Sequence, residues 1–199
     1  MMDLTEASLV RLARNFYPTG YPVRNDEYDA DGLLQLQRTP EHARWLKAWD
    51  KAMDWPEWQT LHQEIKRVLP VYSDCTQPRA AACRRCCVYV ERPLPDGARH
   101  LTIVAVAVSV LAPLYLVYCN TDIMVGRHLQ ERQVLLEVPE EVKPQAATLA
   151  ELVERVLGYQ AFPLRFADVW VPGIRVGNGI REGATVLDAL FDHKLDSLY

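Results

Sequence analysis

The stretch Leu101-Thr-Ile-Val-Ala-Val-Ala-Val-Ser-Val-Leu-Ala-Pro-Leu-Tyr-Leu-Val-Tyr-Cys119 is the long apolar run of this chain and contains no charged residue. A helix of about twenty apolar residues crosses a bilayer, so a membrane span is one interpretation of the run. Two features favour strands instead. Valine and isoleucine dominate the run, and Pro113 interrupts it where a buried strand would bend or end. We therefore predict two buried β-strands, one on each side of Pro113.

Strand and turn patterns on both sides of this run predict a sheet. The segment Cys86–Arg92 has the composition of a strand, and Pro95-Asp-Gly97 predicts a hairpin turn that leads into the run. Gln133–Val138 predicts a further strand, and a short strand is expected around Val169–Val176, before the turn Gly177-Asn-Gly179. We expect a central antiparallel sheet of about four strands.

Apolar residues recur at helical spacing in several other segments. The predicted helices span residues 3–17, 39–53, 54–69, 140 or 144 to 157, and 185–191. Asp3 and Glu6 resemble a capping arrangement, and Thr39-Pro40 is a strong helix start. The second and third of these helices are expected to form a hairpin. Together with the sheet, they predict an α+β fold in which an N-terminal group of helices and a later helix pack on the sheet.

The length and composition are those of a single folded domain covering residues 1–199. Hydrophobic residues make up 49% of the chain and charged residues 24%, which is ordinary for a globular protein. The net charge of −4 argues against nonspecific nucleic-acid binding, which needs a basic excess. The amino terminus lacks the charged and apolar regions of a secretory signal, so we expect a cytoplasmic location. The odd number of cysteines, five, favours reduced thiols.

The cysteine cluster Cys83-Arg-Arg-Cys86-Cys87 contains one CxxC pair, and Cys75 and Cys119 are the other thiols available to complete a zinc site. Structural zinc usually needs two such pairs, and neighbouring residues of a strand point to opposite faces. We therefore expect buried thiols, with no metal and no cofactor. A metal-binding protein or enzyme that uses Cys83, Cys86 and Cys87 is the alternative class of function.

The polar segment between residues 21 and 38 concentrates negative charge. Glu27, Asp29 and Asp31 alternate and are followed by Gly32, as in the first half of a calcium-binding EF-hand loop. Counted from Glu27, however, the twelfth position is Arg38, where that loop requires glutamate. A solvated acidic loop fits better. The histidines show no catalytic or metal-binding spacing, so we predict no catalytic residues and no enzymatic activity.

Four of the five tryptophans, Trp45, Trp49, Trp55 and Trp58, lie within the two helices predicted between residues 39 and 69. Trp45, Trp49 and Trp58 fall on the apolar stripes of those helices, which predicts that they belong to the core. Trp55 lies at the junction between the two helices. It is therefore expected to be the most exposed of the four and the one available for binding a partner.

Several stretches resemble bacterial immunity proteins encoded beside polymorphic or type VI secreted toxins. The stretches are Ser8–Pro22 (SLVRLARNFYPTGYP), Arg38–Trp45 (RTPEHARW), Ala82–Val88 (ACRRCCV) and Ala112–Tyr115 (APLY). This resemblance implies a cytoplasmic inhibitor that neutralises a cognate toxin, with nucleases among the candidate toxins, by direct protein contact. It places no known binding residue on this chain. From the net charge and from the strand interpretation of the apolar run, we expect no nucleic-acid partner and no membrane partner.

An acidic protein of this kind is suited to covering the basic substrate cleft of a toxin, because opposite charges speed and orient the encounter. The hypothesis places the toxin contact on the acidic loop, with Tyr28 as an aromatic anchor and Trp55 as a further contact. The carboxylates of this hypothesis are Asp26, Glu27, Asp29 and Asp31.

Overall fold

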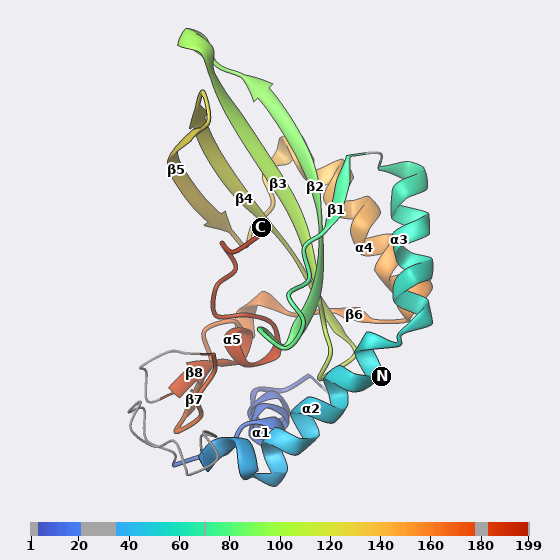
Figure 1. Ribbon diagram of the computed structural model, residues 1–199, viewed down its shortest axis with the longest axis vertical. Helices are drawn as coiled ribbons and strands as arrows, with labels where there is room; N and C mark the ends of the chain where they lie inside the picture. Colours follow the sequence, from blue (N-terminus) through green and yellow to red (C-terminus); the bar gives the residue numbers. More distant parts are fainter. Residues whose placement is uncertain (1–3, 21–34, 70, 178–182, 199) are drawn as a thin grey trace.

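The computed structural model describes residues 4–20, 35–69, 71–177 and 183–198. The apolar run forms the centre of an antiparallel sheet, as strands β3 (Ala98–Ser109) and β4 (Leu114–Val125) (Figure 1). The chain turns at residues 110–113, so the prediction of two strands separated at Pro113 is confirmed. None of the described helices is both long enough and apolar enough to span a membrane.

Three further strands extend the sheet, and a fourth joins it at one end. The strand order is β1-β2-β3-β4-β5 with antiparallel neighbours, and β6 pairs with β4 in parallel. The expectation of about four strands is therefore too low, because the described residues alone form a sheet of six. β1 and β6 are too short to show an apolar period in the sequence. The bounds are β1 (Tyr72–Asp74), β2 (Cys83–Pro93), β5 (His128–Leu135) and β6 (Gln160–Ala161).

β2 and β3 are joined by the predicted hairpin turn. Asp96 and Gly97 adopt positive φ angles of 59° and 73°, and the backbone N–H of Leu94 donates to the carbonyl of Ala98 at 2.9 Å. Two positive φ angles in a row match the twist of a hairpin, which explains why aspartate and glycine occupy the turn. The turn also fixes the register of the sheet, which runs from Pro93 opposite Arg99 to Cys83 opposite Ser109.

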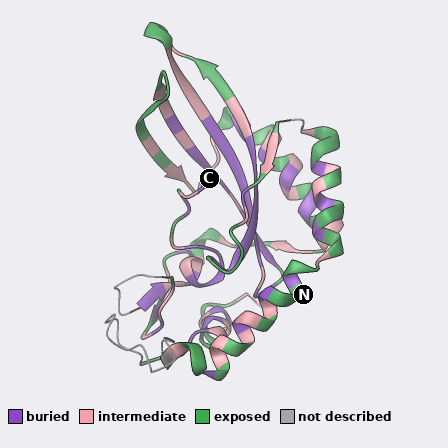
Figure 2. Ribbon diagram, viewed as in Figure 1, coloured by how far each residue is buried: buried purple, intermediate pink, exposed green. Residues whose placement is uncertain are grey.

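Both faces of β3 are buried from Thr102 to Ser109, which explains why the sequence is apolar at every position from Ile103 to Val108. Ile103, Ala105 and Ala107 belong to one apolar cluster, and Val104, Val106 and Val108 to another on the opposite face. Successive side chains of a strand point to opposite faces. A strand covered on one face only would alternate with polar residues, whereas this one is buried throughout its second half (Figure 2).

Two helices cover one face of the sheet, α3 (Pro56–Val68) and α4 (Lys143–Leu157) (Figure 1). Their inward side chains form the second cluster together with the even-numbered valines of β3. Gly158 ends α4 with a φ angle of 68°, so the prediction of this helix and of its stop is confirmed. The buried helical residues on this face are Trp58, Leu61, Ile65, Ala146, Leu149, Leu152 and Val153.

The remaining elements gather on the other cluster. They are α1 (Glu6–Phe16), α2 (Pro40–Met53), β7 (Trp170–Pro172), β8 (Gly183–Thr185) and α5 (Val186–Leu190). The predicted C-terminal helix is thus confirmed, and the strand expected around 169–176 is shorter than predicted and pairs with β8. Short 3-10 helices lie at η1 (Gln35–Arg38), η2 (Pro95–Gly97), η3 (Glu140–Val142) and η4 (Leu164–Phe166).

Two predictions about the N-terminal helices are wrong. α2 and α3 do not form a hairpin, because α2 packs against α1 whereas α3 packs against α4. The cap of α1 is not at Asp3: the Thr5 side chain accepts from the Ser8 N–H at 3.2 Å, and the Ser8 hydroxyl accepts from the Thr5 N–H at 3.0 Å. Serine completes this reciprocal cap in place of the usual glutamate. The predicted cap of α2 at Thr39 is confirmed.

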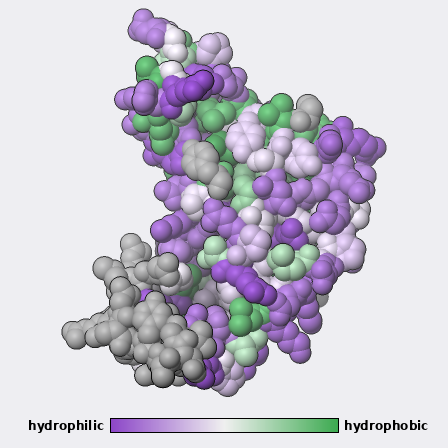
Figure 3. All heavy atoms as spheres, viewed as in Figure 1, coloured by the Kyte–Doolittle hydropathy of each residue, from purple (hydrophilic) through white to green (hydrophobic). Residues whose placement is uncertain are grey.

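One end of the sheet projects beyond the helices (Figures 1 and 2). It consists of the turn between β2 and β3 and the turn between β4 and β5, where the chain is exposed from residue 125 to residue 131. Val125 and Leu129 are 46% and 45% exposed. Figure 3 shows apolar residues among polar ones over this end. β5 is shifted toward this end relative to the predicted strand at 133–138.

Candidate functional site

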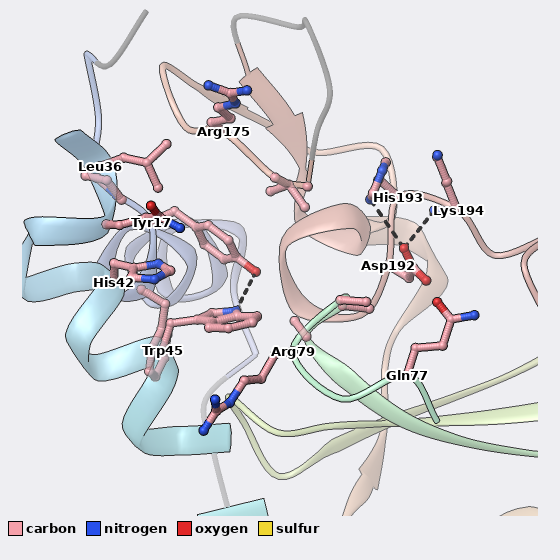
Figure 4. Close-up of a pocket in the computed structure, with 18 of the residues that line it drawn as sticks. Tyr17, Leu36, His42, Trp45, Gln77, Arg79, Arg175, Asp192, His193 and Lys194 are labelled. Atoms are coloured by element: carbon pink, nitrogen blue, oxygen red, sulfur yellow. Dashed lines mark hydrogen bonds and ion pairs between the residues drawn. The ribbon is translucent and has the colours of Figure 1, made fainter. Parts of the chain in front are cut away.

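A cavity of about 480 Å³ lies between the N-terminal helices and the C-terminal segment (Figure 4). Its wall is built from the end of α1, the start of α2, the loop between β1 and β2, and residues around 175–177 and 192–197. This volume is in the range of cavities that hold small organic ligands. The packing of α1 and α2 against the C-terminal segment therefore creates the main candidate ligand site among the described residues.

Aromatic side chains form one side of the cavity. The rings of His42 and Trp45 are stacked, with centroids 5.8 Å apart and planes 11° from parallel. The Trp45 indole N–H donates to the Tyr17 hydroxyl at 3.2 Å, and that hydroxyl donates to the carbonyl of Ala189 at 2.9 Å. Burial raises the pKa of Tyr17 above its ordinary value, which keeps the hydroxyl protonated as a donor. This side of the cavity is therefore held in place by hydrogen bonds.

A buried carboxylate organises the opposite side. Asp192 lies 3.1 Å from a guanidinium nitrogen of Arg85, and its other oxygen lies 3.3 Å from Nδ1 of His193. The backbone N–H of Lys194 donates to Asp192 at 2.9 Å. The Arg85 and Asp192 side chains are 1% and 6% exposed, so the pair is desolvated. Asp192 thereby joins a strand of the sheet to the residues that border the cavity.

His193 packs directly on the backbone of Gly177. Gly177 has a φ angle of 61°, and a Cβ atom added there would lie 2.2 Å from Cε1 of His193. A side chain at this position would have to displace the imidazole and would also strain the backbone. The absence of a side chain at Gly177 thus lets His193 pack on the backbone there, and glycine also adopts the positive φ angle without strain.

Replacing Gly177 by alanine is expected to lower the free energy of unfolding by about 2 kcal/mol or more, from backbone strain of about 1 kcal/mol plus the displaced imidazole. Gly158 is the matched control, because its φ angle is 68° but nothing lies within 4 Å of an added Cβ. Urea unfolding of both alanine variants measures the difference. Equal losses in the two variants would contradict the packing of His193 on residue 177.

Trp55 lies at the junction of α2 and α3 and is half-buried. Its ring stacks on Trp58, with centroids 6.1 Å apart, and contacts Tyr159 just after α4, at 5.6 Å. Trp45, Trp49 and Trp58 are buried, as predicted, so Trp55 is the most exposed of the four tryptophans in this region. Trp55 is thus partly exposed while its ring is in contact with Trp58 and Tyr159.

Carboxylates and an exposed methionine surround Trp55. Met53 is 48% exposed, and Asp54 and Glu57 are exposed on either side of the tryptophan. Neither carboxylate forms an ion pair with any residue in the described parts of the chain. Glu57 lies near enough to Tyr159 to contribute, after burial, to raising the pKa of that tyrosine. We call the surface formed by Met53, Asp54, Trp55, Glu57 and Tyr159 the junction patch.

The cysteines do not converge on one site. Cys83 and Cys87 belong to one apolar cluster and Cys86 to the other, so the CxxC pair is split between the two faces of the sheet. Within the described residues, no group of His, Cys, Asp or Glu side chains is arranged to hold a metal ion. All five thiols are free and buried. The Sγ atoms of Cys75 and Cys87 lie 2.6 Å apart, and this contact lowers the pKa of Cys75.

The acidic loop of the hypothesis lies outside the described residues, so its Asp26, Glu27, Tyr28, Asp29 and Asp31 remain predictions from sequence.

Sequence reasoning missed Arg85, Asp192 and His193. The two adjacent arginines, Arg84 and Arg85, were a usable signal because apolar residues lie on both sides of them, at 80–83 and 86–90, and arginine is rarely buried without a partner. Nothing in the sequence singles out Asp192 as that partner. Comparison of the chain with protein-family models, with curated proteins and with solved structures found no match.

Proposed function

We propose that the protein is an immunity protein that acts in the cytoplasm and neutralises a cognate antibacterial toxin by direct contact. The toxin is of the polymorphic or type VI secreted class, and a nuclease is the activity that best fits an acidic inhibitor. The observation that carries this proposal is the junction patch, in which a half-buried tryptophan is flanked by carboxylates without ion-pair partners among the described residues.

The composition of the junction patch is that of a protein-binding surface. Aromatic residues and methionine are enriched at the centre of interfaces, and tryptophan and tyrosine often contribute most of the binding energy. Trp55 is held by Trp58 and Tyr159, so it loses little conformational entropy when a partner covers it. A fixed aromatic ring beside an exposed methionine supports a protein partner.

The charge of the patch favours a basic partner. Asp54 and Glu57 have no described cation to neutralise them, and the chain as a whole carries a net charge of −4. A toxin that cuts nucleic acid needs a basic cleft to hold phosphates. Carboxylates facing such a cleft would speed association and orient the complex. We therefore commit to the basic surface of the toxin as the occupant of the junction patch.

Replacing Asp54 by asparagine and Glu57 by glutamine is expected to weaken toxin binding at least tenfold at low salt, and replacing Trp55 by alanine to weaken it further. The partner for the measurement is a catalytically inactive form of the cognate toxin, which the proposed function expects to be encoded beside the gene of this protein. Calorimetry gives the dissociation constants. Rescue of cells that express the active toxin provides the corresponding functional readout.

The matched control replaces Glu137 and Glu151 by glutamine, since both are exposed, lie outside the junction patch and have no ion-pair partner among the described residues. This control should bind the toxin as the unaltered protein does. Equal weakening in both double variants would show that only net charge matters and would remove the patch from the interface. Failure of the unaltered protein to bind or to rescue would contradict the proposed function itself.

The acidic loop is the second proposed contact. The same assay, applied to a variant with serine in place of Asp26, Glu27, Asp29 and Asp31, measures its contribution separately from that of the junction patch. Unchanged affinity at low salt would remove the loop, with its Tyr28, from the interface.

A further inference from the structure

Two thiols, those of Cys75 and Cys87, meet at one edge of the sheet. β1 is an edge strand that pairs with β2 through three residue pairs (Figure 1), and the N–H of Cys75, the residue after β1, continues this pairing by donating to the Arg85 carbonyl at 3.0 Å. Cys75 and Cys87 belong to the same apolar cluster, with their Sγ atoms 2.6 Å apart. An S–S bond is about 2.05 Å long, so bonding requires the sulfurs to approach by about half an ångström.

Cys75 is the most accessible thiol of the chain. All five cysteines lie among the described residues, and all are free. Cys75 is 7% exposed, whereas each of the other four is 1% exposed or less. It also follows the exposed Asp74 and precedes a loop whose residues 77–80 are exposed. A small reagent in solution therefore reaches Cys75 more easily than any other thiol of this protein.

The surroundings of Cys75 also favour its thiolate. The hydrogen bond with Cys87 lowers the pKa of Cys75, against the effect of burial, and the Arg85 guanidinium lowers it further. For the three cysteines outside this pair, burial raises the pKa instead, and the contact with Cys75 raises the pKa of Cys87. The thiolate is the nucleophilic form of cysteine. Cys75 is thus placed to react first, with Cys87 in contact as its resolving thiol.

We propose that Cys75 and Cys87 form a peroxide-sensitive pair that closes into a disulfide. The Cys75 thiolate attacks hydrogen peroxide, breaks the O–O bond and becomes a sulfenic acid, with hydroxide as the leaving group. The Cys87 thiol then attacks that sulfur and displaces the oxygen as water. In total, two thiols lose two electrons and two protons, and one peroxide is reduced to two molecules of water. A dithiol such as dithiothreitol reverses the reaction by thiol–disulfide exchange.

The bond would tie β1 and the loop that follows it to the middle of β2. Residues 76–86 would lie within the closed loop, among them Gln77 and Arg79, which border the cavity (Figure 4). A disulfide that closes a loop of this size restricts the unfolded chain, so we expect the oxidised protein to have an unfolding equilibrium constant at least tenfold lower than the reduced one. The inference concerns the edge of the sheet and does not depend on the proposed toxin binding.

Thiol counting on the full chain tests the proposal. The reduced protein is treated with hydrogen peroxide, then denatured and alkylated with N-ethylmaleimide, and its mass is measured. Two of the five thiols should be protected from alkylation, and a digest should contain the peptide with Cys75 joined to the peptide with Cys87. Five alkylated thiols, or a bond from Cys75 to another cysteine, would overturn the proposal.

Three variants separate the two roles. Cys75→Ala should slow thiol oxidation at least tenfold, and Cys87→Ala should form no disulfide but leave a sulfenic acid at Cys75 that dimedone traps. Cys119→Ala is the matched control, because Cys119 is equally free and buried but belongs to the other apolar cluster. It should form the disulfide at a rate within twofold of the unaltered protein. Equal slowing in the Cys75 and Cys119 variants would contradict a reaction specific to the pair.

Urea unfolding of the oxidised and reduced forms tests whether the bond fits the native positions of the two strands. The oxidised protein should unfold at a higher urea concentration, and dithiothreitol should return it to the midpoint of the reduced form. An oxidised protein that unfolds more readily than the reduced one would show that the bond distorts the edge of the sheet, which would contradict a pair placed to close.

Discussion

Replacing Asp192 by alanine is expected to lower the free energy of unfolding by about 3–5 kcal/mol, because it leaves the buried Arg85 guanidinium without its counter-charge. The Arg85 side chain is 1% exposed, so water contacts it too little to replace the lost carboxylate. The loss is large because the desolvation cost of the cation stays while the attraction that offset it is removed. Chemical denaturation at neutral pH measures this change directly.

The matched variant for this prediction replaces Arg85 by methionine and Asp192 by leucine together. Apolar residues of similar volume carry no desolvation cost, so the double variant should recover most of the stability that the single variant loses. The two positions touch, so their effects are coupled, and the difference between single and double variants measures the coupling. A double variant as unstable as Asp192→Ala would mean that packing around residue 192, and not charge, controls stability there.

Replacing Trp49 by alanine is expected to cost about 3–5 kcal/mol, since it empties a large volume in the core. Trp49 is fully buried in the cluster that joins α2 to the sheet. Its indole N–H donates to the carbonyl of Ala81 at 2.9 Å, so the variant also leaves a buried acceptor without its donor. Urea unfolding gives the loss, provided that the slope of the transition is unchanged.

Two further variants separate the contributions at this position. Trp49→Phe keeps much of the apolar volume but removes the donor, so it should cost less than alanine by about 1–3 kcal/mol. Trp170→Ala is the surface control, because Trp170 is 48% exposed, and its loss should stay near 1 kcal/mol or less. If Trp49→Ala and Trp170→Ala lowered the free energy of unfolding by similar amounts, the assignment of Trp49 to the core would be contradicted.

The elements with strong local patterns are the ones that the sequence predicts correctly. The run of residues 101–119 forms two strands because its β-branched residues and Pro113 act locally, whatever the rest of the chain does. The start of α2 at Thr39-Pro40 and the end of α4 at Gly158 depend on caps within a single turn. Such signals need no knowledge of tertiary contacts.

The elements that the sequence predicts wrongly or not at all share a physical cause: they depend on tertiary contacts. β1 and β6 are recognisable only through their partners in the sheet, since three or two residues carry no apolar period. The prediction that α2 and α3 form a hairpin was wrong because an amphipathic stripe shows that a helix buries one side. It does not show which surface covers that side. The two helices follow one another in the chain, yet they cover opposite faces of the same sheet.

The features of the candidate sites also divide into those that the sequence predicts and those that depend on tertiary packing. The sequence by itself determined which tryptophan near the α2–α3 junction is the most exposed and that Cys86 and Cys87 lie on opposite faces of the sheet, because both follow from position within a helix or a strand. Only the tertiary structure decided that Asp192 neutralises Arg85 and that Tyr159 supports Trp55. These residues come from distant parts of the chain, and their proximity is set by how the helices and the C-terminal segment pack on the sheet.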